Sequence, residues 1–336
     1  MVAASMKPTT KTTATSPEIV SGALPGSRRP AGPRTPVEPS SSSWAFEYPF
    51  SSQWLNVGSQ GEPRWLHYVD EGPKDAPVLV FLHGNPTWSF YWRKLIIELR
   101  DRYRCIAPDH LGMGLSDRPQ DARYLLRSHI DHVDALLHAL GVERYAIIGH
   151  DWGGCIGAGV AVRRPENVTS VVWMNTAAFL SQSIPLSIAS CRVPVFGPFA
   201  VLGFNAFAKV ATWRAMKKHD RMTKTVKAGY LAPYGNPHDR IATLRFVEDI
   251  PLRPSHPSWA TLHDIEEKLG TLQEKPVALF WGNADFCFTP AFRKRFEKEF
   301  PQAVVESWDD CGHYVVEDAH ERILPALRTF LDKHAR

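Results

Sequence analysis

A carboxylate stands at the centre of a Gly-x-Asp-x-Gly pattern, Gly149-His150-Asp151-Trp152-Gly153. The apolar run Tyr145-Ala146-Ile147-Ile148 precedes the pattern, and a run of small residues follows it. This order is typical of a nucleophile elbow, a strained turn between a strand and a helix that exposes one side chain above a sheet. Because a carboxyl with a reference pKa near ~3.9 is ionised at neutral pH, Asp151 can attack carbon and form an alkyl-enzyme ester. The competing interpretation is a helix N-cap, which Asp also favours.

Two residues further along the chain supply what an Asp nucleophile needs. Asp285 follows an apolar strand-like run, and His313 lies in a loop after the last predicted strand. The order nucleophile, acid, His is that of α/β-hydrolases, and open α/β sheets place their sites beyond the carboxyl ends of strands. We therefore predict Asp151 as nucleophile, His313 as the base that activates water, and Asp285 as the acid that orients His313. Asp309 and Asp310 are rival acids, although they are close in sequence to His313.

Hydrogen-bond donors are predicted beside the nucleophile. The sequence His83-Gly84-Asn85-Pro86 follows another apolar run. The backbone N–H groups of Asn85 and Trp152 are predicted to stabilise an oxyanion, and one such donor is worth roughly 2.7–4 kcal/mol. The side chains of the same two residues are also donors. They suit a leaving anion, such as a halide, that needs hydrogen bonds but no proton. The plainer interpretations are a turn residue for Asn85 and core packing for Trp152.

The elements that position these residues alternate between strands and helices. Leu126, Ile130, Val133, Leu137 and Leu140 are spaced as one apolar helix face. Further helices are predicted over about 88–99, 290–299 and the C-terminal stretch. Short apolar runs predict strands at 65–69, 78–82, 104–108, 145–148, 171–174, 277–282 and 304–305. This alternation predicts an α/β fold, with a mostly parallel sheet covered by helices on both faces.

The alternation stops in one long stretch and is absent from the start of the chain. Residues 177–273 are rich in Pro and aromatics, which predicts a helical cap inserted between core segments 44–176 and 274–336. Residues 1–43 are rich in Ser, Thr and Pro and poor in large apolar residues, which predicts a disordered tail.

Composition excludes several classes of function. The 336 residues include 39 basic and 35 acidic ones, a net charge of +4 that argues against a nucleic-acid partner. The five cysteines are scattered without metal-ligand spacing, which indicates reduced thiols in a cytoplasmic protein and neither a disulfide framework nor a zinc site. No apolar run is long enough for a transmembrane helix, and the start lacks the apolar core of a signal peptide. No cofactor is expected, and a homo-oligomer is compatible with the sequence.

Three motifs carry a family resemblance. The stretches 83–93 (HGNPTWSFYWR), 149–154 (GHDWGG) and 310–314 (DCGHY) resemble the haloalkane dehalogenases, which are α/β-hydrolases with a helical cap. The resemblance covers roughly 44–336, including the cap stretch 230–251. It implies the α/β-hydrolase fold and no cofactor.

The resemblance also implies roles for single residues. Asp151 would be the nucleophile, His313 the base, and Asn85 with Trp152 the halide-binding pair. In one dehalogenase subfamily the acid is a Glu after the strand that follows the elbow helix. The corresponding sequence here is Met-Asn-Thr-Ala at 174–177, which contains no acid. Asp285 is therefore the better candidate, and the set Asp-His-Asp with Asn-Trp resembles the third subfamily.

The first expectation is a haloalkane dehalogenase that converts a small apolar halogenated substrate and water into an alcohol and a halide. The β-lactone decarboxylases of bacterial olefin biosynthesis resemble the same subfamily and carry the same residues, so they are the alternative. Epoxide hydrolases share the HGxP and GHDWGG motifs, and Tyr230 and Tyr234 could be their acids, but Asn85 argues against them. A ligand-binding relative without turnover is the last alternative, and the intact Asp-His-Asp set argues against it.

Overall fold

The computed structural model describes residues 42–59 and 61–335, and within them eight strands form one sheet. The strands are β1 (Gln53–Asn56), β2 (Trp65–Glu71), β3 (Val78–Leu82), β4 (Arg104–Pro108), β5 (Tyr145–Asp151), β6 (Val168–Thr176), β7 (Val277–Gly282) and β8 (Val304–Trp308). Their order in the sheet is β1-β2-β4-β3-β5-β6-β7-β8. The β1–β2 and β2–β4 pairs are antiparallel, and the other five pairs are parallel.

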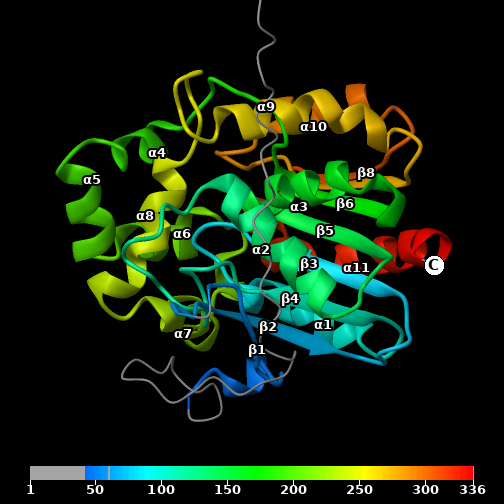
Figure 1. Cartoon of the computed structure of the whole chain (residues 1–336), viewed down its shortest axis with the longest axis horizontal. Helices are drawn as coiled ribbons and strands as arrows, with labels where there is room; N and C mark the ends of the chain where they lie inside the picture. Colours follow the sequence, from blue (N-terminus) through cyan, green and yellow to red (C-terminus); the bar gives the residue numbers. More distant parts are fainter. Residues whose placement is uncertain (1–41, 60, 336) are drawn as a thin grey trace, which may run out of the picture.

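Helices cover both faces of this sheet and also form the long segment between β6 and β7 (Figure 1). The helices against the sheet are α1 (Arg93–Leu99), α2 (Leu126–Ala139), α3 (Trp152–Arg163), α10 (Pro290–Glu299) and α11 (Val315–His334). Those between β6 and β7 are α4 (Leu186–Ser190), α5 (Phe196–Pro198), α6 (Ala206–Arg214), α7 (Lys224–Leu231), α8 (Ile241–Glu248) and α9 (Trp259–Lys268). Short helical turns are η2 (Ala45–Glu47), η3 (Ser89–Trp92), η4 (Pro165–Asn167), η5 (Phe199–Gly203), η6 (His219–Arg221), η7 (Ala232–Tyr234), η8 (Pro237–Arg240) and η9 (Leu269–Leu272).

Strand β3 shows why the central strands are continuously apolar. Successive side chains of a strand point to opposite faces of the sheet. Val80 and Leu82 belong to the hydrophobic cluster that includes α2, α3 and α10, whereas Leu79 and Phe81 belong to the cluster that includes α1 and α11. Both faces are buried, so every position must be apolar. The predicted parallel sheet with helices on both faces is confirmed.

The element bounds follow the sequence patterns closely in the core. The structure begins and ends β3, β4, β7 and α10 at the predicted residues, and the helix predicted over 88–99 divides into η3 and α1. Strand β1 was not predicted. It is a four-residue edge strand in which only Leu55 is buried, so it lacks an apolar run. The tail predicted over 1–43 lies outside the described residues except for its last two.

The helices between β6 and β7 are not all alike in position. Figure 1 shows α4 to α8 beside the sheet, whereas α9 packs against α2 and α3. The cap bounds 177–273 stay a prediction. Among the described helices, none is both long enough and apolar enough to cross a membrane.

A chain of four histidines next to β3, three of them buried and His132 half-buried, predicts acid sensitivity. The rings of His83, His110, His129 and His132 follow one another at 4.4, 5.6 and 6.1 Å between centroids. Burial lowers the pKa of all four, to about 4 for His132. Because an unfolded His has a pKa near ~6.5, the unfolded state binds more protons as pH falls below that value, and folding loses stability.

We therefore expect the free energy of unfolding in urea to fall between pH ~7 and pH ~5. Both ring nitrogens of His129 are buried without a hydrogen-bond partner in the described structure. His129→Leu should thus flatten the pH dependence without removing a hydrogen bond. If the free energy of unfolding changes equally with pH in the variant and in the parent protein, this explanation is contradicted.

Candidate active site

The nucleophile elbow has the strained backbone that its sequence predicts. Asp151 ends β5 and precedes α3 with φ 54°, in the left-handed region that non-glycine residues rarely adopt. Thr176 Oγ1 donates to the Asp151 carbonyl oxygen at 2.5 Å. A Cβ on Gly153 would lie 1.9 Å from the Leu82 carbonyl oxygen, and one on Gly154 would lie 2.2 Å from Thr176 Oγ1. The small residues after Asp151 therefore let α3 begin against β3 and β6.

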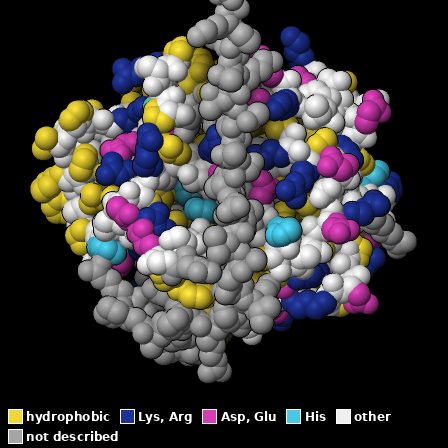
Figure 2. All heavy atoms as spheres, viewed as in Figure 1, with side chains coloured by type: hydrophobic (Ala, Val, Ile, Leu, Met, Phe, Trp, Pro, Cys, Tyr) yellow, Lys and Arg dark blue, Asp and Glu magenta, His cyan; other side chains and the backbone are white. Residues whose placement is uncertain are grey.

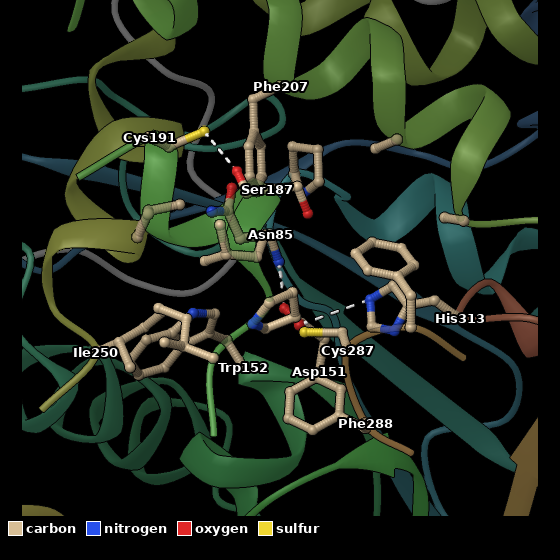
Figure 3. Close-up of a pocket in the computed structure, with 18 of the residues that line it drawn as sticks. Asn85, Asp151, Trp152, Ser187, Cys191, Phe207, Ile250, Cys287, Phe288 and His313 are labelled. Carbon is tan, nitrogen blue, oxygen red and sulfur yellow. Dashed lines mark hydrogen bonds and ion pairs between the residues drawn. The ribbon is translucent and has the colours of Figure 1, made fainter. Parts of the chain in front are cut away.

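Asp151 lines a cavity together with Asn85, Trp152 and His313 (Figure 3). The Asn85 N–H donates to Asp151 Oδ1 at 2.7 Å, and the Trp152 N–H also bonds this carboxylate. Oδ2 lies 3.6 Å from His313 Nε2. Burial raises the pKa of Asp151, while His313 and the two N–H groups oppose that rise. The carboxylate is therefore held by backbone donors and lies beside the His313 ring.

His313 is held by the acid that the chain order predicts. His313 Nδ1 lies 2.8 Å from Asp285 Oδ2, and both side chains are buried. Burial lowers the pKa of His313, but the charge and hydrogen bond of Asp285 and the charge of Asp151 outweigh it, so the pKa is raised. The structure therefore brings Asp151, His313 and Asp285 together at the carboxyl ends of β5, β8 and β7.

The rival acids point elsewhere. Asp310 is exposed and pairs with Arg322 at 2.9 Å, and Asp309 accepts a hydrogen bond from Asn283 at 2.7 Å. His150, beside the nucleophile, stacks on Tyr91 with the ring centroids 4.5 Å apart. These positions leave Asp285 as the acid that contacts the His313 ring.

The side chains of Asn85 and Trp152 both line the cavity beside Asp151 (Figure 3). Asn85 Nδ2 donates one hydrogen bond to the Thr243 carbonyl oxygen of α8 at 3.0 Å, and its Oδ1 has no partner in the described structure. A primary amide has two N–H donors, so the second stays available. Trp152 packs edge to face on Phe246, also of α8. Helix α8 therefore orients both donors.

Two further residues, which the sequence patterns did not predict, contact the predicted ones. Asn175 Nδ2 donates to Asp285 Oδ2 at 2.9 Å and to the Gly282 carbonyl oxygen at 3.0 Å. Asn175 lies in the stretch 174–177, which was compared above with the acid of one dehalogenase subfamily. That comparison was the feature of the sequence that could have pointed to Asn175. His150 Nε2 lies 2.8 Å from the His313 carbonyl oxygen. Burial lowers the pKa of His150 far below its usual range, so His150 is a neutral donor.

The cavity above Asp151 has a volume of about 370 Å³. Its walls come from the elbow, the loops after β7 and β8, and helices α4, α5 and α6, and are mostly apolar. Tyr230 and Tyr234 do not line it. The Tyr230 hydroxyl donates to Glu317 Oε1 at 2.6 Å, and the Tyr234 hydroxyl donates to the Thr87 carbonyl oxygen at 3.2 Å. The acids that an epoxide hydrolase would need are therefore engaged outside the cavity.

Gly84 provides a sharp test of this geometry. A Cβ at Gly84 would lie 2.1 Å from Asp151 Oδ1, which is closer than any real contact. We expect Gly84→Ala to displace the carboxylate and to lower kcat by about 10²-fold or more, because small displacements of reacting groups have large effects. Gly141→Ala is the control for substitution of a glycine, since no described atom lies within 4 Å of a Cβ there, although its φ of 63° adds strain. Equal activity of Gly84→Ala and the parent enzyme would contradict the geometry.

Known proteins resemble this chain over most of its described length. Residues 77–319 match the family model described as alpha/beta hydrolase fold. A cis-3-alkyl-4-alkyloxetan-2-one decarboxylase from Xanthomonas campestris pv. campestris is 42% identical, over 80% of this chain and 93% of that protein. Haloalkane dehalogenase 2 from Mycobacterium tuberculosis is 37% identical, over 83% of this chain and 94% of that protein.

A solved structure extends the likeness to the fold. The haloalkane dehalogenase DbeA from Bradyrhizobium elkani matches with a TM-score of 0.76 and 26% identity, covering 84% of this chain and 98% of that chain. The match to the family model, over 77–319, includes the helices between β6 and β7 as well as most of the sheet. The chain belongs to the haloalkane dehalogenase family of the α/β-hydrolase superfamily.

Proposed function

We propose that the protein is a β-lactone decarboxylase, which converts a cis-3-alkyl-4-alkyloxetan-2-one into an alkene and carbon dioxide. The observation that carries this proposal is that Asp151 lines a mostly apolar cavity of about 370 Å³. Such a cavity has room for a ring that bears two alkyl chains. The relatives that are 42% and 40% identical, both named as such decarboxylases, support the proposal. The order of the two leading expectations from sequence is thereby reversed.

The first step is attack on the lactone ring. Asp151 Oδ2 attacks ring carbon C4, and the bond between C4 and the ring oxygen breaks with its electron pair. An ester to Asp151 forms, and the former ring oxygen becomes part of a free carboxylate. That carboxylate needs hydrogen bonds and no proton, so the Asn85 amide and the Trp152 indole are the proposed donors.

The second step regenerates the nucleophile. The bond between the carboxylate carbon and C3 breaks, carbon dioxide leaves, and the electron pair forms the C3–C4 double bond. The C4–oxygen bond of the ester breaks and returns its pair to Asp151. No water is consumed. His313, whose pKa is raised by Asp285 and Asp151 against the effect of burial, is proposed to carry a positive charge that stabilises the anions of both steps.

Haloalkane dehalogenation is the second candidate, because the same donor pair and nucleophile suit a halide leaving group. It is supported by the 37% identical dehalogenase. In this reaction His313 must be neutral to activate water. Alkylation of Asp151 removes a negative charge that raises the pKa of His313, so the pKa of His313 falls after the first step and more of the ring is in the neutral form that accepts a proton.

The two reactions differ in what happens to the oxygens of Asp151. Water attacks the Asp151 ester in dehalogenation, so each turnover in water labelled with heavy oxygen places label in the carboxylate. Decarboxylation returns Asp151 with both of its own oxygens. We therefore expect a dialkyl β-lactone to give a cis-alkene and an unlabelled Asp151 peptide by mass spectrometry. A hydroxy acid together with a labelled peptide would contradict the decarboxylase proposal. Halide release from a bromoalkane, with labelled peptide, would favour the second candidate.

A further inference from the structure

Large apolar side chains are exposed mainly on one part of the molecule. Of the twelve exposed large hydrophobic residues within the described ranges, eight lie between residues 186 and 213, on or beside α4, α5 and α6. We name these eight the cap apolar face: Leu186, Val193, Val195, Phe196, Phe199, Phe204, Val210 and Trp213. In Figure 2, hydrophobic side chains gather along the left edge, where Figure 1 places α4 and α5.

Packing among the described residues does not explain why the side chains of the cap apolar face are exposed. Val195 is 84% exposed and has φ 68°, a strained backbone for a β-branched residue. Phe199 and Phe204 pack edge to face on each other with centroids 5.0 Å apart, yet remain 64% and 60% exposed. Exposed apolar surface of this kind marks contact with a membrane or a partner.

The cap apolar face is continuous with the active-site cavity. Phe196 and Val210 line the cavity and are 56% and 49% exposed. Cavity-lining residues Ile184 and Ile188 lie beside Leu186 in the same segment. The cavity therefore opens within the apolar face, and an apolar substrate held there can reach it without crossing open water.

The charges around the face favour an anionic partner. The stretch 177–219 contains five Lys and Arg residues and no Asp or Glu. Lys209, Arg214 and Lys217 are exposed, and none of their side chains forms an ion pair with a described acidic residue. The Arg214 guanidinium lies over the Phe286 ring at 4.6 Å at the cavity wall and keeps its charge. On neighbouring α8, Glu248 is paired with Arg245 at 2.6 Å. Apolar side chains flanked by unpaired cations are typical of surfaces that bind anionic lipid.

We infer that the cap apolar face docks on an anionic lipid surface and that lipid-dissolved substrate enters the cavity between Phe196 and Val210. The entry route rests on the proposed function, since it assumes a substrate with alkyl chains. The docking itself does not, because it can be measured without substrate.

The test is sedimentation of the full chain with vesicles, either of phosphatidylcholine alone or of equal parts phosphatidylcholine and phosphatidylglycerol. We expect binding to the mixed vesicles that weakens with salt. The combined variant Val195→Ser, Phe199→Ser and Phe204→Ser should bind at least about tenfold more weakly, because it removes the apolar area that the lipid would cover. These three residues do not line the cavity, so conversion of a short-chain lactone in solution should stay unchanged.

Matched controls and further outcomes separate the explanations. The double variant Phe46→Ser and Val304→Ser removes exposed apolar residues outside the face and should bind vesicles like the parent protein. Vesicle binding without conversion of the lactone would contradict the proposed function and support the docking. Conversion without vesicle binding would overturn the docking. A dimer that the triple variant dissociates, in the absence of vesicle binding, would also overturn it and identify the face as a protein interface.

Discussion

Asp151→Asn is expected to lower kcat/KM by at least about 10⁴-fold, for a β-lactone and for a bromoalkane alike, because an amide cannot displace either leaving group. The substitution preserves the size of the side chain, and the Asn85 N–H can still donate to an amide oxygen in place of Asp151 Oδ1. Initial rates at substrate concentrations well below KM measure the loss, with the melting temperature as the control for folding. An intact-mass check must show that the introduced amide has not deamidated. Residual activity above about 1% would mean that another group attacks the substrate.

The His313→Ala variant extends this prediction, because the two candidate reactions need His313 differently. With a bromoalkane, attack by Asp151 precedes activation of water, so the alkyl ester should accumulate and add the alkyl mass to the Asp151 peptide. With a β-lactone, the ester collapses without water, so turnover should continue at a rate lowered by about 10²–10³-fold through loss of the cation. An ester that accumulates with both substrates would mean that His313 is needed to break it in each case.

The largest expected loss of stability follows from Glu317→Ala. Glu317 is fully buried in α11 and contacts the buried guanidinium of Arg93, the Lys94 ammonium at 3.0 Å and the Tyr230 hydroxyl at 2.6 Å. Removing Glu317 leaves Arg93 buried with only the more exposed Glu47 as an acidic partner. Breaking a buried pair in this way destabilises a protein by about 3–5 kcal/mol, which lowers the melting temperature by roughly 10 °C.

A matched control lies on the same helix. Glu321→Ala removes an exposed pair with Arg221 and should change stability by less than about 1 kcal/mol. Burial raises the pKa of Glu317, but Arg93 and Lys94 outweigh it and lower the pKa to about 2. The stabilisation is therefore complete above the unfolded pKa of about 4.3 and is lost as pH falls toward 2. Equal melting temperatures for the two variants, measured at neutral pH, would contradict this account.

Glu317 also shows where the cap is anchored. Through Tyr230 of α7 it connects a helix inserted between β6 and β7 to the last helix of the chain. Glu317→Ala is therefore expected to loosen the cap as well as the core. Nothing in the local sequence around either residue indicated this contact, because residues 87 positions apart form it.

Local patterns in the sequence were sufficient to predict the sheet and the strained turn at Asp151. Apolar runs identified the core strands, because a strand that is buried on both faces must be apolar at nearly every position. The elbow at Asp151 was recognisable because a left-handed residue between strand and helix needs small neighbours, and Gly153 and Gly154 supply them. Such requirements involve neighbours along the chain, so they leave a local signature.

Only the tertiary structure decided which groups meet. Asp285 and Asp310 both follow strands, yet Asp285 contacts His313 whereas Asp310 pairs with Arg322 at the surface. Sequence alone leaves Tyr230 and Tyr234 as candidate acids. In the structure their hydroxyl groups donate to Glu317 and to the Thr87 carbonyl oxygen, outside the cavity. That Phe196 and Val210 both line the cavity and belong to the cap apolar face likewise depends on how separate helices pack. Contacts between distant segments are set by three-dimensional packing and burial, and a side chain's type and sequence spacing do not encode them.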